Sequence, residues 1–135
     1  MNIEERLQQL EESNTELKKE LNAIKFRLDL IANKTNTSQV LYDYEVNHEQ
    51  YEAIMDLMDE IRKKLDAHEN CSDTFFESRM KKIFPDPTDP KHDYHFAEEI
   101  AQAFMEDGRW EEVFPALYGN EKKFQSYFDN LNKRT

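Results

Sequence analysis

The sequence predicts an all-α protein in which an N-terminal coiled-coil helix precedes a compact helical domain of about four helices. The first observation behind this prediction is an apolar repeat that runs through residues 3–31 in alternating steps of four and three. The second is the scarcity of turn formers, because only two glycines and four prolines occur among 135 residues. Sheets built from many short strands need more of these residues, whereas long helices need few.

The repeat in residues 3–31 has the form of a leucine zipper. Leu7 and the residues at seven-residue steps from it occupy heptad position a, and Ile3 and its successors occupy position d. One isolated helix cannot bury such a seam, which therefore needs a partner, most simply a second copy of the chain. The predicted oligomerisation residues, which form this seam, are Ile3, Leu7, Leu10, Asn14, Leu17, Leu21, Ile24, Leu28 and Ile31.

The flanks of the seam favour a parallel homodimer. In that arrangement Arg6 at position g faces Glu11 at position e of the other copy, and Glu20 at g likewise faces Lys25. Asn14 is the one polar residue of the seam, and two such amides hydrogen-bond across a dimer. Leucine at a with isoleucine at d favours trimers or tetramers instead, so a tetramer stays an alternative. Another alternative is that the stripe packs on later helices of the same chain.

These patterns divide the chain into three segments. Residues 1–33 form the coiled coil, residues 34–46 a linker, and residues 47–135 an acidic helical domain. The linker opens with a polar break, and its later part, 39–46, fits either an extended stretch or a short helical turn. Within the domain, the apolar spacing predicts helices over about 47–69, 72–84, 89–107 and 120–131, with a short amphipathic piece at 110–118.

Two helix starts in the domain carry recognisable signals. Asn47 followed by Gln50 resembles a capping box, in which each side chain bonds the backbone of the other. Asp89 followed by Pro90 is an N-cap residue with proline at the first helical position. We therefore expect helices to begin at both places.

The net charge of −11 is unevenly distributed. Residues 1–38 hold six Lys/Arg and seven Asp/Glu, so the zipper is nearly neutral. The remaining residues hold 12 Lys/Arg and 22 Asp/Glu, a net charge of −10. So acidic a surface repels phosphate backbones and argues against direct nucleic-acid binding. It serves solubility in the simplest interpretation, and a basic partner protein is the functional alternative.

The cellular setting is indicated by what the sequence lacks. Cys71 is the only cysteine, which excludes an internal disulfide and suits a reducing compartment. The sequence has no signal peptide and no apolar run long enough to span a bilayer. We expect a cytoplasmic protein that does not bind membranes.

The candidate contacts to a partner lie around the predicted turn after residue 107. Trp110 is either an anchor of the domain's own core or an exposed anchor for a partner. The partner-binding candidates are Glu98, Glu99, Trp110, Glu111 and Glu112.

The candidates for metal chemistry are few. His68 and Cys71, followed by His92 and His95, form two pairs at a spacing that could close a tetrahedral zinc site. Three histidines with one cysteine are an uncommon ligand set, so surface histidines and a half-buried thiol are favoured, and no cofactor is expected. The carboxylate pairs that a magnesium-dependent helical nucleotide hydrolase would use are Glu49/Glu52, Asp56/Asp59 and Glu98/Glu99. The apolar pattern places these acids on the solvent side.

Two stretches of the domain are similar to a known family. Residues 51–61 read Tyr-Glu-Ala-Ile-Met-Asp-Leu-Met-Asp-Glu-Ile, and residues 96–114 include Gly-Arg-Trp-Glu-Glu-Val-Phe. Both resemble the YhaI-like family of small helical bacterial proteins, in which a Glu- and Leu-rich helix precedes a helical hairpin turned at a glycine. The resemblance covers about residues 45–118 and implies the fold only, because the family has no established activity. The zipper, the loop at 85–90 and the basic, aromatic tail depart from it.

The sequence therefore predicts a non-enzymatic, self-associating acidic protein that binds and regulates or inhibits a partner protein. One alternative is a protein that binds or sequesters a small molecule such as a nucleotide signal. Its basic candidates are Arg79, Lys81, Lys82 and Arg109. The other alternative is the metal-dependent nucleotide hydrolase.

Overall fold

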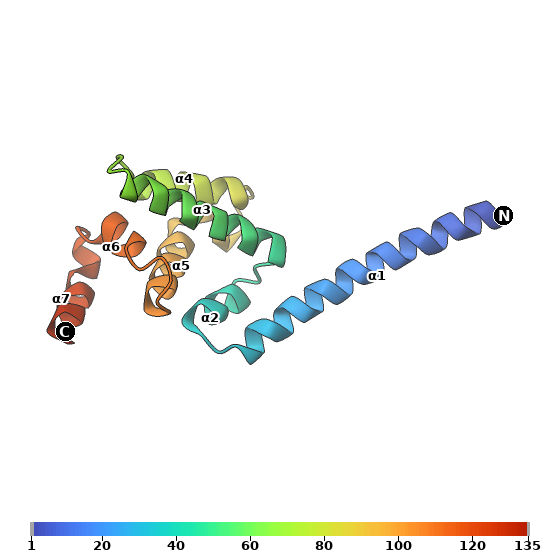
Figure 1. Cartoon of the computed structure of the whole chain (residues 1–135), viewed down its shortest axis with the longest axis horizontal. Helices are drawn as coiled ribbons and strands as arrows, with labels where there is room; N and C mark the ends of the chain where they lie inside the picture. The colour runs from blue at the N-terminus through green and yellow to red at the C-terminus, as the bar shows by residue number, and fades with distance from the viewer. Residues whose placement is uncertain (1, 135) are drawn as a thin grey trace.

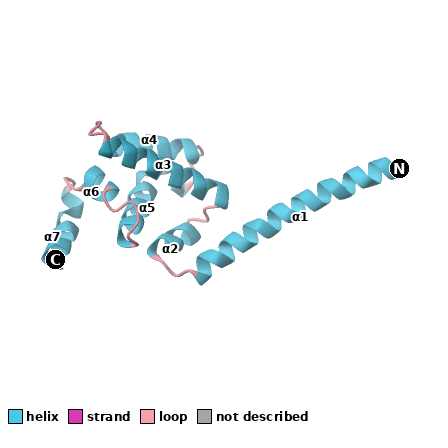
Figure 2. Cartoon of the chain, viewed as in Figure 1, coloured by secondary structure: helices cyan, strands magenta, loops and turns pink. Residues whose placement is uncertain are grey.

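The computed structural model describes residues 2–134, of which Arg134 is described by its backbone alone. It is all-α: 77% of the chain is helical, in seven α-helices with no strands in the described part (Figures 1 and 2). The long helix α1 (Ile3–Ala32) projects away from a compact group formed by the remaining helices (Figure 1). The predicted all-α class is confirmed, as is the order of a long N-terminal helix followed by a compact helical part. We call α1 the stem and residues 36–134 the body.

The body consists of six α-helices and two short 3-10 segments. Asn47 and Gln50 form the predicted capping box at the start of α3, and Ser72 caps α4 through the amide of Phe75. The elements in chain order are α2 (Asn36–Asp43), α3 (His48–Asp66), α4 (Asp73–Ile83), η1 (Pro90–His92), α5 (Tyr94–Glu106), α6 (Val113–Tyr118), η2 (Lys122–Phe124) and α7 (Gln125–Arg134).

The signal at residues 89 and 90 does not begin the long helix that we expected there. Asp89 accepts a hydrogen bond from the amide of Lys91, but the turn it caps is the 3-10 segment η1. The chain becomes extended at Asp93, and α5 begins at Tyr94. The local cap was identified correctly, and the helix it opens is only one turn long.

Residues 34–46, expected as a linker, contain helix α2 and form part of the body. Leu41 and Val46 are each 1% exposed, and α2 packs against α5. The start of α2 is held by a residue of the α5–α6 turn: the Asp107 carboxylate accepts hydrogen bonds from the amides of Asn36 and Thr37. These contacts fix α2 in place, so only residues 33–35 separate it from the stem.

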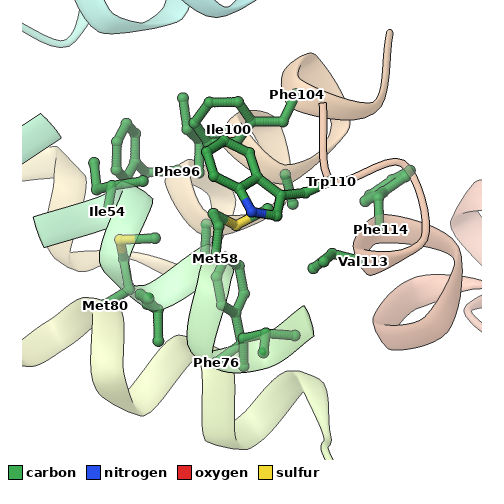
Figure 3. Close-up of a cluster of buried hydrophobic side chains, with 14 of the residues drawn as sticks. Ile54, Met58, Phe76, Met80, Phe96, Ile100, Phe104, Trp110, Val113 and Phe114 are labelled. Atoms are coloured by element: carbon green, nitrogen blue, oxygen red, sulfur yellow. The ribbon is translucent and has the colours of Figure 1, made fainter. Parts of the chain in front are cut away.

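The core of the body lies around α5 (Figure 3). Phe96, Ile100 and Phe104 of this helix are fully buried, and α2, α4 and α6 pack against it. Trp110 follows at the turn after α5, with a positive φ of 46°, and its ring meets that of Phe104 edge-on. Each large apolar side chain buried in this way stabilises the fold by about 1.5–3 kcal/mol.

Candidate self-association surface on the stem

The seam of the stem is open to solvent along its whole length. Its apolar side chains are between 49% exposed, at Ile31, and 75% exposed, at Ile3, and Asn14 is exposed among them. Folded monomers rarely leave so long an apolar strip uncovered. The alternative that this stripe packs on later helices of the same chain is therefore wrong.

The stem is attached to the body through its opposite face. Leu30 is 9% exposed, and the Phe26 ring lies 5.2 Å from the ring of His48 and 5.9 Å from that of Tyr51. Phe26 and Leu30 fall at heptad positions f and c, which lie across the helix from a and d because each residue advances the helix by about 100°. The attachment therefore leaves the seam free.

The sequence of the stem favours a helix without help from the seam. Residues 3–32 contain no glycine or proline, and most are strong helix formers. Asn2 caps the first turn by accepting a hydrogen bond from the amide of Glu5 at 2.8 Å. Acidic Glu4 and Glu5 also suit the positive end of the helix dipole.

The charged side chains of the two predicted flanking pairs are exposed to solvent. Among the described residues, the ion pair inside α1 joins Lys19 and Glu16 at 3.6 Å, and both side chains point to solvent. No flanking side chain at positions e or g in the predicted pairs forms an ion pair within residues 2–134: these are Arg6, Glu11, Glu20 and Lys25.

Most of the partner-binding candidates are engaged within the body instead. Trp110 is 8% exposed, and its indole N–H donates to Asp59 at 2.8 Å, so it is a core anchor and not an exposed one. Glu98 is 7% exposed and pairs with Lys123, and Glu112 pairs with Arg62.

Glu99 and Glu111 are the two partner-binding candidates that stay exposed without an ion pair among the described residues. Burial of the Tyr44 phenol, together with the nearby Glu99, raises the pKa of Tyr44. Because a hydrogen bond to Tyr44 engages Glu99, Glu111 is the candidate that has neither a hydrogen bond nor an ion pair among the described residues.

The four residues of the proposed zinc set do not form a site. Within residues 2–134, no group of three or more His, Cys, Asp or Glu side chains is arranged to hold a metal ion. The Nδ1 atom of His92 lies 2.7 Å from the carbonyl oxygen of Phe84, and the His95 ring stacks on Tyr94. Burial raises the pKa of the Cys71 thiol, which disfavours the thiolate that a metal needs.

The carboxylate pairs are likewise dispersed. Asp59 accepts the Trp110 bond, and Glu52 lies 3.4 Å from His48 on the exposed side of α3. Glu49 and Asp56 are exposed on the same helix. The described residues therefore bring no set of carboxylates together around one interior cleft.

The basic candidates for nucleotide binding also do not converge. Arg79 pairs with Glu60 at 2.6 Å, and Lys81 and Lys82 are exposed at the end of α4. Arg109 donates to the Tyr51 hydroxyl at 2.8 Å and lies over the ring of Trp110.

Two features were not foreseen from the sequence. One is the pair of buried Tyr118 and half-buried Glu77, joined by a hydrogen bond of 3.1 Å, in which burial raises the pKa of both groups. The other is a cavity of about 670 Å³ in the angle between α1 and α2, which we call the elbow cavity. Its walls include Ile31, Asn36 and Tyr42. No local sequence pattern predicts this cavity, because it depends on how α2 docks.

Comparisons of the chain with protein-family models, curated proteins and solved structures found no match. The resemblance to the YhaI-like family stays a prediction. None of the described helices combines the length and the apolar character needed to cross a membrane.

Proposed function

We propose that this chain is a non-enzymatic, self-associating protein that binds and regulates or inhibits a partner protein. The observation that carries the proposal is the uncovered seam of the stem, whose apolar side chains are 49–75% exposed along a helix of 30 residues. A second copy presents the same strip and covers it symmetrically.

The gain from covering the seam is large enough for association. Full burial of a Leu or Ile side chain is worth about 1.5–3 kcal/mol, so these half-exposed side chains contribute about 1 kcal/mol each. Eight such side chains in each of two copies contribute on the order of 15 kcal/mol. Association costs about 4–15 kcal/mol, so the free energy gained by covering the seam equals or exceeds this cost.

A parallel arrangement satisfies the polar residues of the seam best. It sets Asn14 beside Asn14 of the second copy, and both predicted flanking pairs join opposite charges. An antiparallel arrangement sets Asn14 against Leu17 and brings Arg6 close to Arg27 of the other copy. The parallel homodimer is therefore our proposal, with the tetramer as the alternative that isoleucine at position d favours.

The body supports the second half of the proposal through its charge. Glu49, Asp56 and Glu111 are exposed and form no ion pair among the described residues, and the chain beyond residue 38 carries −10. A partner protein with a basic surface fits this charge, whereas nucleic acid does not. Two bodies held together by their paired stems would bind a partner bivalently, which raises avidity without new contacts. A cytoplasmic location belongs to the same proposal.

The proposal is tested by placing charge in the seam. The double change Leu17→Glu and Leu21→Glu puts four carboxylates into the shared interface, and we expect monomers where the unchanged protein gives dimers. Analytical ultracentrifugation at tens of micromolar measures the mass. A pull-down from the native host with both proteins then shows whether loss of the dimer weakens partner capture.

The matched control is Thr15→Glu with Asn22→Glu. It adds the same charge to the same exposed helix at heptad position b, off the seam. This control should keep the dimer mass. A monomeric unchanged protein, or a dimer that survives Leu17→Glu with Leu21→Glu, would refute self-association through the seam.

A further inference from the structure

The dimer that we propose leaves Arg27 of the stem without a charged partner, as it does Lys18, which faces Ser13. Arg27 occupies position g near the end of α1, and the residue that faces it at position e of a parallel second copy is Ala32. The other two charged g positions face residues of opposite sign. Arg27 instead stacks over the ring of Tyr42 in its own chain, with 4.8 Å between the guanidinium carbon and the ring centroid.

This stacking places α2 beside the flank of the seam. Tyr42 is 37% exposed although Arg27 covers one of its faces. The elbow cavity lies at the same place, and its walls include Ile31, the last residue of the seam, as well as Lys34 and Gln39. A second helix seated on the seam would therefore end at the mouth of this cavity.

We infer that the second copy occupies the elbow cavity, so that each α2 packs Tyr42 against the C-terminal end of the other copy's stem, at Ala32. The inference rests on the proposed parallel dimer. The surface is isologous, because the two-fold axis that relates the stems repeats the contact on both sides.

Three properties of the surface fit a second copy of this chain. Alanine at position 32 leaves room for a tyrosine ring, where a long side chain would block it. Lys34 forms no ion pair among the described residues, so its ammonium can reach a carboxylate or carbonyl across the interface. The cavity also continues the seam through Ile31, so covering one surface brings the second copy to the other.

The contact would fix how the two bodies sit on the stem. A coiled coil alone holds its two helices together and leaves the direction of each body to the attachment at Phe26 and Leu30. With Tyr42 packed on the second stem, α2 and therefore α5 are tied to both copies. An antiparallel dimer would instead bring the N-terminal end of the other stem, with Glu4 and Glu5, to this cavity.

The first test compares two exposed tyrosines. Tyr42→Ala should weaken the dimer about tenfold, measured as the dissociation constant by sedimentation equilibrium of the full chain. Tyr94→Ala is the control, because Tyr94 is 43% exposed and also lies beside a cation, Lys123, but stands on the body away from the stem. Its dissociation constant should equal that of the unchanged protein.

The second test enlarges Ala32. Ala32→Arg leaves the monomer undisturbed, because residue 32 is exposed, but it fills the space that Tyr42 of the second copy needs. We expect weaker dimerisation, whereas Asn22→Arg on the outer face of the stem should have no effect. A dimer that depends on the seam but is indifferent to Tyr42→Ala and Ala32→Arg would overturn this inference and leave the proposed function standing. A protein with no seam-dependent dimer would overturn both.

Discussion

In the stem, the apolar side chains of the seam are 49–75% exposed, whereas in the body side chains of the same kinds, such as Ile54 and Ile100, are fully buried. The net charge, in contrast, lies in the body: the stem is nearly neutral, whereas the body carries a net charge of −10. The body thus closes its own core and keeps charge outside, as a folded monomer does. The stem is helical, but its apolar seam is left uncovered, and this favours association with a second molecule.

The largest expected effect comes from a comparison in which one large apolar side chain in each region is truncated to alanine. Phe104→Ala removes a fully buried ring that packs against Trp110, and we expect a loss of about 3–5 kcal/mol in the stability of the body. Denaturation followed by Trp110 fluorescence measures this loss. Leu21→Ala, the matching change in the stem, should weaken association and leave the body's stability unchanged. If Leu21→Ala destabilised the body equally, the two regions would not be independent.

A smaller effect is expected from the polar residue of the seam. Asn14→Leu removes the amide pair of the proposed dimer, and we expect a more heat-stable assembly whose mass rises to that of a trimer or tetramer. Light scattering coupled to gel filtration reports the mass. Asn22→Leu, off the seam, is the control. An Asn14→Leu protein that stays dimeric and melts earlier would show that Asn14 does not lie in a shared interface.

The smallest effect concerns the joint between the two regions. Burial raises the pKa of Asp107, but hydrogen bonds from Thr37 and Asn36 outweigh it and hold that pKa below its usual value. The ionised carboxylate therefore stabilises the fold above the usual pKa, and this contribution disappears as the pH falls through the lower pKa of the folded state. Asp107→Asn should cost about 1 kcal/mol at pH 7, because both carboxylate oxygens accept hydrogen bonds from α2 and the amide keeps only one accepting oxygen.

The cost of Asp107→Asn should shrink as the pH falls through the lowered pKa of Asp107, below which the unchanged protein also carries a neutral side chain. Urea denaturation at a series of pH values measures it, with Asp56→Asn on the exposed side of α3 as control. A difference that is independent of pH would show that the charge of Asp107 does not hold α2.

Local patterns predicted the parts of the fold that depend on local physics. The repeat of residues 3–31 predicted one continuous helix, and the capping pair at Asn47 and Gln50 predicted the start of α3. Each of these features is determined within a few turns of chain.

The parts that were missed depend on distant residues. Helix α2 is short and buries Thr37 and Ser38, so its apolar spacing is ambiguous, and its start is capped by Asp107, some 70 positions away. The one-turn segment η1 ends because the chain turns at Asp93 to enter α5. The elbow cavity exists because α2 docks on α5, which no local pattern records.

The attachment of the stem through Phe26 and Leu30 has a consequence for how this architecture can change in length. The seam and the attachment to the body both lie on the helix α1. The number of residues between them therefore sets the angle, measured around the helix axis, at which the body stands relative to the seam. One residue inserted ahead of Phe26 would turn the body by about 100° around the stem, while seven would advance it by about 10 Å at nearly the same azimuth. In the proposed dimer, the stem could therefore be lengthened only in whole heptads if each body were to keep its orientation relative to the seam.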